Sequence, residues 1–252
     1  MTYPEDFINK VICGDCLEVM KDIPDKSVDM ILADLPYGTT ACKWDTRIPF
    51  EPLWEQYKRI IKDNGAIVLT ASQPFTSALV MSNIKMFKYE WVWEKSIGAN
   101  PLLCKKQPMK YHENILVFAN GKTIYNPQMT KGKMRDKRPK MFGNKKDENW
   151  GGAMREIKGI ENINDDYYPR SYQYFSNADQ KNKLHPTQKP VALFEYLIKT
   201  YTNEGDLVLD NCAGSGTTGV ACKKTGRKYI LIEISEKYCK IAEERLRQEI
   251  LL

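Results

Sequence analysis

Four consecutive residues, Asp34-Leu35-Pro36-Tyr37, place a carboxylate close to an aromatic ring directly after an apolar run. The run, VDMILA at 28–33, predicts a buried strand, and Gly38 after the motif is typical of a turn. Ligands of open α/β sheets bind at the carboxyl ends of such strands. A carboxylate can accept hydrogen bonds from an amine while a ring stacks on a flat base, so the pattern favours a planar base with an exocyclic amino group. An ordinary strand followed by a turn is the alternative interpretation.

A second pattern, near the other end of the chain, is typical of a nucleotide-binding strand, turn and helix. Residues 206–210 (DLVLD) predict a buried strand, and the glycine-rich run 211–218 (NCAGSGTT) leads into a helical stretch. Gly214 and Gly216 allow a tight turn and a close approach of the backbone to a ligand. Glu233 ends the next predicted strand, 23 residues after Asp210, which is near the spacing at which an acid holds ribose hydroxyls. The run is neither GxGxxG nor a P-loop, so an adenosine with an amino-acid tail fits as well as a phosphate ligand.

Together the two patterns resemble the amino-methylating DNA methyltransferases that use S-adenosylmethionine. The motif at 34–37 is similar to their catalytic motif, (D/N/S)PP(Y/F/W), with Leu35 in place of the usual proline. The catalytic motif comes first and the cofactor loop last, an order that resembles the β group of the family. Further likeness lies in CGDCL at 13–17, in WEK at 93–95 with HENILVF at 112–118, and in HPTQKP at 185–190. The resemblance covers most of the chain except about 119–184.

The resemblance implies a role for each position of the 34–37 motif. The Asp34 carboxylate and the Leu35 backbone carbonyl accept the two hydrogen bonds of the target amine and stabilise the positive charge that it gains. Tyr37 stacks on the base, which must first be rotated out of the duplex. Pro36 keeps Leu35 extended despite the departure from the family motif.

The identity of the target base follows from the family alone. Aspartate at position 34 favours N6 of adenine in double-stranded DNA over N4 of cytosine, although both amines can form the same hydrogen bonds. Cytosine N4, an RNA target and a non-catalytic DNA-binding partner subunit are the alternatives. The resemblance is also compatible with a homodimer.

The resemblance further assigns a set of residues to S-adenosylmethionine. Glu233 is expected to hold the ribose hydroxyls, Asp15 the adenine end and Lys189 the methionine carboxylate. The glycine-rich loop is expected to line the methionine part. Ordinary surface charge is the alternative for the three charged side chains. The complete set of implied cofactor-binding residues is Asp15, Lys189, Asp210, Cys212, Gly214, Gly216, Thr217 and Glu233.

The positive charge of the chain is concentrated in one segment. Between 119 and 150, nine lysines and arginines face three acidic residues, and this excess equals the net charge of +6 of the whole chain. Such a segment indicates a polyanionic partner, most simply nucleic acid, and a solvated insert is the alternative. The residues expected to contact nucleic acid are Lys131, Lys133, Arg135, Lys137, Arg138 and Lys140.

Length and cysteine usage limit the class of protein. The 252 residues suffice for one large domain, alone or with an insert, and no run of 18 apolar residues predicts a membrane-spanning helix. The N-terminus lacks a signal-peptide pattern, and seven scattered cysteines are typical of reduced thiols in a cytoplasmic protein. Cys13 and Cys16 have the spacing of half a metal site, but no second pair accompanies them, so we expect no metal.

Hydrophobic patterns predict alternating strands and helices. The predicted strands span 10–13, 28–33, 66–71, 89–93, 115–119, 206–210 and 228–233, with a long proline-rich loop between 93 and 115. The predicted helices span 18–23, 52–61, 75–83, 191–201, one that begins at 217, and 236 to the C-terminus. This alternation predicts an α/β fold with a mostly parallel, Rossmann-like methyltransferase sheet and a permuted motif order.

The permuted order predicts where the two motifs meet. If the halves lie side by side, the strands that end in Asp34 and Asp210 are neighbours at the switch point of the sheet. Cofactor and target would then share one crevice. Residues 1–118 and 185–252 are expected to form the S-adenosylmethionine-binding catalytic domain, and 119–184 an inserted basic target-recognition lobe over the crevice.

Overall fold

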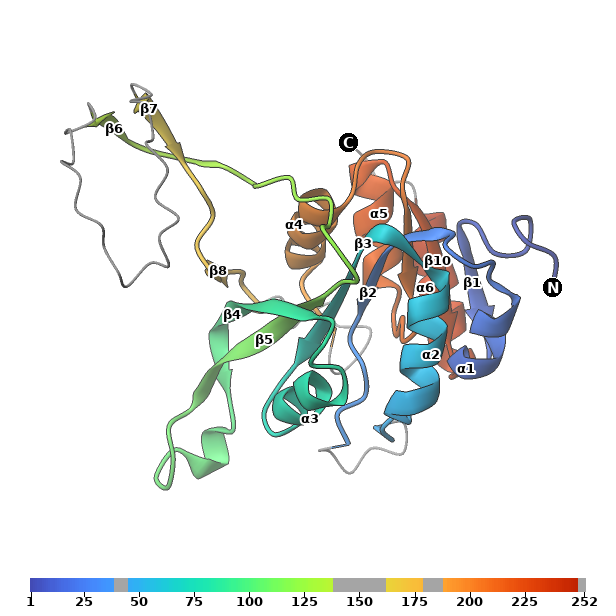
Figure 1. The fold of residues 1–252 in the computed structure, drawn as a ribbon. Helices are drawn as coiled ribbons and strands as arrows, with labels where there is room; N and C mark the ends of the chain where they lie inside the picture. Colours follow the sequence, from blue (N-terminus) through green and yellow to red (C-terminus); the bar gives the residue numbers. More distant parts are fainter. Residues whose placement is uncertain (39–44, 138–161, 179–187, 249–252) are drawn as a thin grey trace. The chain divides into compact units, whose positions relative to one another are not determined.

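Eight strands form one mixed sheet in the computed structural model of the chain, which describes residues 1–38, 45–137, 162–178 and 188–248 (Figure 1). The order across the sheet is β1-β10-β9-β2-β3-β5-β4-β8. The strands are β1 (Lys10–Cys13), β2 (Val28–Ala33), β3 (Ile61–Ala71), β4 (Phe87–Ala99), β5 (Lys110–Phe118), β8 (Tyr172–Tyr174), β9 (Leu207–Asp210) and β10 (Lys228–Glu233). The pairs from β1 to β3 are parallel, and β5 is antiparallel to both β3 and β4. The predicted mostly parallel, Rossmann-like sheet is confirmed.

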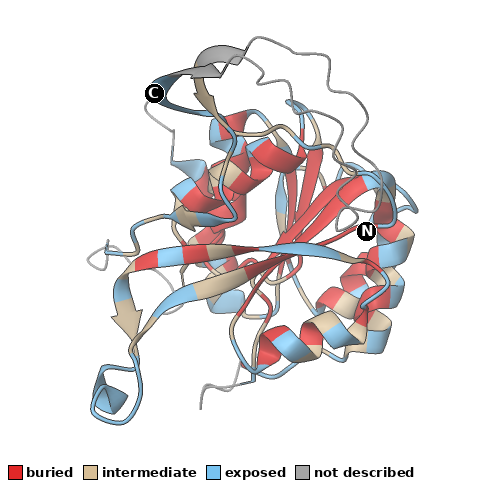
Figure 2. Cartoon of the chain, turned by 60° about the vertical axis from the view of Figure 1, so that its left-hand side comes forward, coloured by how far each residue is buried: buried red, intermediate tan, exposed pale blue. Residues whose placement is uncertain are grey.

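Helices cover both faces of this sheet, and the burial of β2 shows why its sequence is apolar throughout. All six residues of β2 are buried, because Ile31 and Ala33 pack on one face while Met30 and Leu32 pack on the other (Figure 2). The helices of the first face are α1 (Cys16–Val19), α2 (Phe50–Ile60) and α3 (Phe75–Ser82). The helices of the second face are α4 (Val191–Tyr201), α5 (Thr217–Thr225) and α6 (Glu236–Arg247). Two short 3-10 helices are η1 (Met20–Asp22) and η2 (Pro101–Leu103).

The switch point of the sheet lies between β2 and β9. These two strands are parallel neighbours, with Met30 opposite Val208 and Ile31 opposite Leu209. From β2 the chain continues through α2 to β3 on one side, and from β9 it continues through α5 to β10 on the other. The two strands therefore end side by side at Asp34 and Asp210, as the permuted motif order predicts.

The segment predicted as a proline-rich loop between 93 and 115 forms a long hairpin instead. β4 continues to Ala99 and β5 begins at Lys110, which pairs with Ala99. The prediction was wrong because the outer half of the hairpin is exposed and lacks the apolar alternation that indicates a strand. β8 was not predicted either, since its three residues, YQY, are too few to show a period.

The chain divides into two compact units, residues 1–126 with 170–252 and residues 127–169. The predicted insert, 119–184, extends beyond the second unit at both ends. Residues 119–126 belong to the first unit, where the Asn126 backbone donates to Thr200, and so does β8, which pairs with β4.

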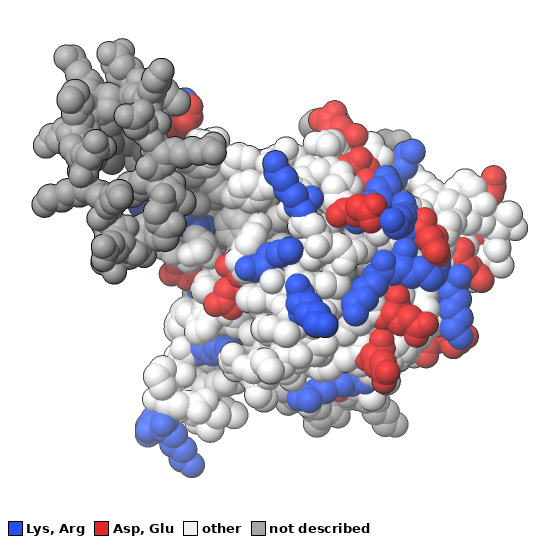
Figure 3. All heavy atoms as spheres, viewed as in Figure 1, with Lys and Arg blue, Asp and Glu red and all other residues white. Residues whose placement is uncertain are grey.

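The second unit contains the strands β6 (Thr130–Lys137) and β7 (Asn162–Tyr167), which pair in antiparallel fashion. On the face of the first unit drawn in Figure 3, basic and acidic side chains are interspersed over most of the surface. No helix in the described parts of the chain has the length and apolar character needed to cross a membrane.

Candidate active site

The two sequence motifs open on one cavity of about 470 Å³ at the carboxyl ends of the central strands. Eleven of the lining residues come from the predicted catalytic motif and the predicted cofactor set. These eleven residues are Asp15, Asp34, Leu35, Pro36, Tyr37, Lys189, Asp210, Cys212, Gly214, Thr217 and Glu233. Residues far apart in the sequence thus converge on one site. Of the two predicted sets, Gly216 alone does not line the cavity.

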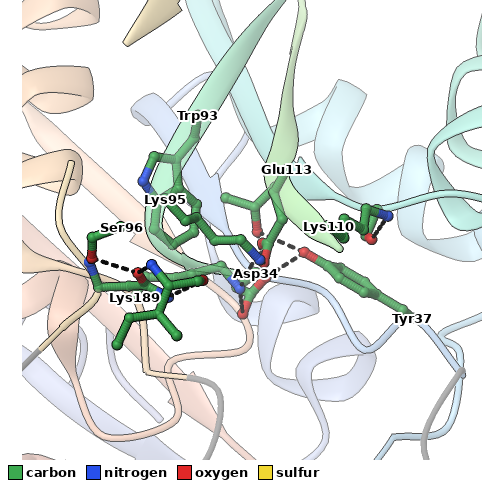
Figure 4. A network of polar contacts seen from close by, with 12 residues as sticks. Asp34, Tyr37, Trp93, Lys95, Ser96, Lys110, Glu113 and Lys189 are labelled. Carbon is green, nitrogen blue, oxygen red and sulfur yellow. Dashed lines mark hydrogen bonds and ion pairs between the residues drawn. The ribbon is translucent and has the colours of Figure 1, made fainter. Parts of the chain in front are cut away.

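Three side chains hold the Asp34 carboxylate (Figure 4). The Tyr37 hydroxyl donates to Asp34 Oδ1 at 2.9 Å, and the Thr70 hydroxyl donates to the same oxygen. The Lys189 ammonium donates to Oδ2 at 2.7 Å. The carboxylate is therefore fixed at the end of β2 by groups from its own loop, from β3 and from the segment before α4.

Lys189 lies in a buried, charge-balanced position. Its side chain is 8% exposed. Its Nζ lies 2.7 Å from Asp34 Oδ2 and 3.4 Å from Glu113 Oε2. Burial lowers the pKa of an ammonium, but the charges of Asp34 and Glu113 outweigh burial and hold the pKa of Lys189 well above its ordinary value. Sequence reasoning assigned Lys189 to the methionine carboxylate, whereas the structure places its ammonium on the carboxylate of Asp34 in the predicted catalytic motif.

Glu113 connects two buried lysines. Its Oε1 accepts a hydrogen bond from Lys95 Nζ at 3.0 Å, and the Lys95 side chain is 7% exposed. Burial raises the pKa of Glu113, but Lys189 and Lys95 together outweigh burial and bring the pKa below its ordinary value. Lys95, Glu113, Lys189 and Asp34 thus form a row of alternating charges that runs from the β4–β5 hairpin to the end of β2.

Sequence reasoning missed three members of this network, Thr70, Lys95 and Glu113. Lys95 and Glu113 lie within the WEK and HENILVF segments, whose family likeness carried no role for single side chains. Thr70 is the one polar residue in the apolar run 66–71 of β3, and that was the one signal in the sequence that could have identified it.

The Tyr37 ring is fixed by an aromatic neighbour. It stacks on Phe75 with ring centroids 5.1 Å apart and an interplanar angle of 24°. The Arg47 side chain donates from Nε to the Tyr37 carbonyl at 2.8 Å and also lines the cavity. Burial and the charge of Asp34 raise the pKa of Tyr37 well above its ordinary value, so its hydroxyl remains protonated and donates to Asp34.

The departure from the family motif at position 35 has a packing reason. The Leu35 side chain is 3% exposed and belongs to the core on the α1–α3 face of the sheet, while the residue also contributes to the cavity wall. An apolar residue of this size fills the core, and Pro36 favours an extended backbone at Leu35, so the backbone carbonyl of the family motif is retained.

Asp210 shapes the turn that carries the glycine-rich loop. Its Oδ1 accepts the Cys212 backbone N–H at 3.0 Å, and its Oδ2 accepts the Thr218 hydroxyl. The carboxylate thereby ties the end of β9 to the first turn of α5. Burial raises the pKa of Asp210 to about 7, the two hydrogen bonds oppose this increase, and the nearby charges of Asp34 and Glu233 add to it.

This shifted pKa predicts a pH dependence of stability in the absence of ligand. The ordinary pKa of an aspartate is about 3.9. Between that pH and about 7 the folded chain binds more protons at Asp210 than the unfolded chain, so the free energy of unfolding contributed by this group falls as the pH rises. We expect D210N to remove this decrease, which is at most about 4 kcal/mol. Urea unfolding of both proteins at pH 5, 6, 7 and 8 measures it, and two parallel curves would contradict the prediction.

Glu233, at the end of β10, and Asp15, just after β1, both line the cavity. Glu233 Oε2 accepts the Gly214 N–H at 2.8 Å, and its Oε1 accepts the Ser235 N–H at 2.9 Å. Asp15 is exposed and caps α1 by accepting the Leu17 N–H at 2.8 Å. Each carboxylate oxygen has a second acceptor site, so both groups can also bind hydroxyl or amino groups of a ligand.

Gly216 contributes to the loop through its backbone. Its φ of 77° is left-handed, and a Cβ at this position would lie 3.0 Å from the Cβ of Ala242 in α6. The residue therefore lets the N-terminus of α5 approach α6 closely, behind the cavity wall.

A pair of substitutions separates strain from crowding at this turn. G216A should lower the free energy of unfolding by roughly 2–3 kcal/mol, because an L-residue with this φ costs about 1–2 kcal/mol and the contact with Ala242 adds to it. Gly205 has a similar φ of 84° and no atom within 4 Å of its Cβ position, so G205A should incur the backbone cost alone. Denaturant unfolding compares the two variants, and equal losses would contradict the role of the close approach.

Cys212 and Thr217 are held by polar neighbours that sequence reasoning did not identify. The Asn211 amide lies 3.6 Å from Cys212 Sγ and 3.5 Å from Cys16 Sγ, and both cysteines line the cavity as free thiols. The Arg245 guanidinium donates to the Thr217 hydroxyl at 3.1 Å. The loop is thus supported by side chains from α1 and α6.

Only two of the predicted nucleic-acid contacts have described side chains, and both lie in the second unit. Lys131 forms ion pairs with Asp165 and Asp166, each at 2.8 Å, and hydrogen bonds to these carboxylates raise its pKa above the ordinary value. Lys133 is exposed. The remaining predicted contacts, whose side chains lie outside the described residues, are Arg135, Lys137, Arg138 and Lys140.

Comparisons with known proteins agree with this geometry. A model of the DNA methylase family matches residues 28–244. The chain is 30% identical over 262 residues to the DNA adenine methyltransferase YhdJ of Escherichia coli (strain K12), covering 94% of this chain and 82% of that protein. It is 28% identical over 254 residues to the type II methyltransferase M.HpaI of Haemophilus parainfluenzae, covering 95% and 74%.

Two solved structures have similar folds. The M1.HpyAVI–SAM complex matches with a TM-score of 0.64 at 25% identity, covering 95% of this chain and 99% of that one. The cytosine-N4-specific PvuII DNA methyltransferase matches with a TM-score of 0.66 at 16% identity, covering 96% of this chain and 87% of that one. At this identity the similarity shows a shared fold only.

Proposed function

We propose that this chain, which belongs to the DNA methylase family, transfers a methyl group from S-adenosylmethionine to the N6 amine of an adenine in double-stranded DNA. The observation that carries the proposal is the shared cavity. The Asp34 motif and the glycine-rich loop line it together, so a group held by the loop can meet a base held by the motif.

The cavity fits S-adenosylmethionine in size and in chemistry. Its volume of about 470 Å³ lies in the range of small-ligand sites. Glu233 and Asp15 offer carboxylate oxygens suited to ribose hydroxyls and to an adenine amine, and the loop around Gly214 offers backbone close to the ligand. When bound, S-adenosylmethionine supplies an electrophilic methyl group on a sulfonium. The chain's own residues must then present a nucleophile to it.

Asp34 has one acceptor site left for the target amine. A carboxylate has about four such sites, and Tyr37, Thr70 and Lys189 use three of them, two on Oδ1 and one on Oδ2. One N–H of the amine can therefore bond Oδ2, and the other can bond the Leu35 carbonyl. Both acceptors favour a pyramidal nitrogen with a localised lone pair, and both stabilise the positive charge that develops on it.

The fixed geometry of Asp34 is the chain's main catalytic contribution in this proposal. Lys189 pairs with the carboxylate and orients it, while Glu113 balances the charge of that lysine. Because these groups are already in place, no reorganisation is needed as charge develops at the amine.

The name of YhdJ, a DNA adenine methyltransferase, supports adenine N6 as the target. Hydrogen bonds to Asp34 and Leu35 alone do not separate it from cytosine N4, since both are exocyclic amines. The segment 119–150, with its excess of positive charge, is proposed to bind the DNA backbone, so affinity should fall steeply with salt. We further infer action in the cytoplasm, where cellular DNA and S-adenosylmethionine are both available.

Methyl transfer to DNA tests the function directly. Unmethylated genomic DNA is incubated with the protein and labelled S-adenosylmethionine, then digested to nucleosides, and a second sample is sequenced for modified positions. We expect N6-methyladenine at one recurring sequence. N4-methylcytosine would reassign the target, and binding of DNA and S-adenosylmethionine without transfer would favour a non-catalytic partner.

A further inference from the structure

The β4–β5 hairpin joins the catalytic network to an exposed tip. Its inner half carries Lys95 and Glu113, which form the charge network with Lys189 and Asp34 (Figure 4). Beyond them the two strands continue and end in a turn that includes η2 (Figure 1). We call residues 97–111 the hairpin tip. It lies in the same compact unit as the cavity.

The hairpin tip exposes apolar side chains that contribute little to the fold. Leu102 is 96% exposed, and Ile97, Leu103 and Tyr111 are each more than two-fifths exposed. These four exposed apolar side chains lie within 15 residues and are not part of the hydrophobic core. Clusters of exposed apolar side chains mark binding surfaces.

The charge of the hairpin tip has one sign. Lys105, Lys106 and Lys110 lie in it, and the sequence from 97 to 111 contains no aspartate or glutamate. Lys110 donates to the Ser72 hydroxyl, whereas Lys105 and Lys106 form no ion pair with any residue that the structure describes. Figure 3 shows the tip as the lowest projection at the left, with blue and no red on the drawn face.

Backbone hydrogen bonds and a left-handed residue define the turn at the hairpin tip. Asn100 has a left-handed φ of 65°, and its carbonyl accepts the Leu103 N–H at 3.0 Å. The Leu103 carbonyl in turn accepts the Lys106 N–H at 2.8 Å. The Tyr111 ring lies across Gly98, where a Cβ would come within 2.6 Å of it. These contacts present Leu102 and the two lysines in a defined arrangement.

We propose that the hairpin tip is a DNA-contacting element, in which Leu102 enters the base stack beside the extruded base while Lys105 and Lys106 bind the flanking phosphates. The inference rests on the proposed function. Apolar wedges between base steps assist unstacking, and lysines on phosphates hold them in register. From Glu113 to Lys110 the strand spans about 10 Å, and the turn with Leu102 lies beyond Lys110, further from the charge network.

A nucleic acid fits the hairpin tip better than a second protein chain does. Exposed leucine alone suits either partner, but lysine is depleted at protein–protein interfaces, and the two adjacent ammonium groups of Lys105 and Lys106 favour a polyanion. The network at the stem adds a functional reason, since the same hairpin holds the groups that position Asp34.

The test uses two variants of the full chain, L102A and the double variant K105Q/K106Q. The substrate is a duplex that carries the sequence mapped by methylation, either with 2-aminopurine at the target position or with the target adenine mismatched. The matched controls are M81A, whose side chain is 71% exposed on α3, and K58Q/K199Q, whose lysines are exposed on α2 and α4. Binding is measured at several salt concentrations, and methylation in single turnover.

We expect different losses from the two variants. K105Q/K106Q should reduce the slope of log affinity against log salt by roughly 2, because each phosphate contact contributes about 0.9. L102A should leave that slope unchanged, reduce the 2-aminopurine fluorescence increase, and slow methylation of the paired target by roughly 10-fold, with recovery on the mismatched target.

Three outcomes would overturn the proposal while leaving the proposed function intact. They are wild-type behaviour of both variants, equal slowing of paired and mismatched targets by L102A, and a change in molar mass by light scattering without a change in DNA binding, which would indicate a protein contact. If the wild-type protein itself methylates no DNA, the proposed function fails, and that result is separate from any effect of the variants.

Discussion

Replacing Asp34 with asparagine is expected to slow methyl transfer by about 10²–10³-fold, which is the usual cost of losing one preorganised electrostatic group. The asparagine keeps the size of the side chain, and its carbonyl oxygen can still accept hydrogen bonds from Tyr37 and Thr70, but its NH₂ group cannot accept the hydrogen bond from Lys189. It loses the negative charge that stabilises the positive charge on the attacking amine. Binding of S-adenosylmethionine should remain, because its proposed contacts lie with Glu233, Asp15 and the glycine-rich loop.

Single-turnover methylation measures this loss, and calorimetric titration with S-adenosylhomocysteine measures cofactor binding. The control is D63N, which alters an exposed carboxylate that pairs with Lys26 and should retain the wild-type rate. A D34N protein that keeps more than a tenth of the wild-type rate would contradict the assigned role. Loss of both activity and cofactor binding would show that the substitution damages the site more broadly.

Replacing Lys189 with methionine is expected to lower the free energy of unfolding by about 3 kcal/mol. Removing one partner of a buried ion pair leaves the opposite charge uncompensated, and the typical cost is about 3–5 kcal/mol. Here Lys189 is 8% exposed and lies between the carboxylates of Asp34 and Glu113. The loss should fall at the lower end, since Asp34 keeps two hydroxyl donors and Glu113 keeps Lys95.

A double-mutant cycle separates this charge effect from lost packing. In K189M/D34N one positive and one negative side chain, Lys95 and Glu113, remain paired, so the double variant should be more stable than the sum of the single losses predicts, by at least about 1 kcal/mol. The matched control cycle is K26M with D63N, an exposed pair whose coupling should be below about 1 kcal/mol. Urea unfolding at pH 7 measures both cycles, and zero coupling between positions 34 and 189 would contradict the network.

The convergence of the two motifs could be predicted from the sequence because it depends on short-range patterns. A buried run followed by Asp34 and a buried run followed by Asp210 each define a strand and its carboxyl end, and the motif order places the two strands side by side. The physics of a doubly covered parallel sheet then brings both ends to one edge. This is why the fold and most of the cavity lining were predicted.

The charge network could not be predicted, because its members come from distant places in the chain. Thr70, Lys95, Glu113 and Lys189 meet at Asp34 only after β3, β4 and β5 have paired in register. No spacing in the sequence encodes such a meeting. A single sequence also gave Lys189 a plausible partner in the cofactor, and only the fold shows that a carboxylate of the chain lies 2.7 Å away.

The outer hairpin escaped prediction for a related reason. Strand signals come from burial on one face, and the hairpin tip has neither a buried face nor an apolar period. Similarly, the predicted helix at 18–23 is a single α-helical turn, Cys16–Val19, followed by the 3-10 turn Met20–Asp22. Short elements of this kind are fixed by contacts such as the Asp15 cap rather than by periodicity.

A crystal structure of the protein with S-adenosylhomocysteine tests the central claim most directly, namely that one cavity holds the methyl donor beside the catalytic carboxylate. The account predicts the ribose at Glu233, the adenine toward Asp15 and the sulfur directed toward Asp34. A ligand bound outside this cavity, or one whose sulfur points away from Asp34, would contradict it.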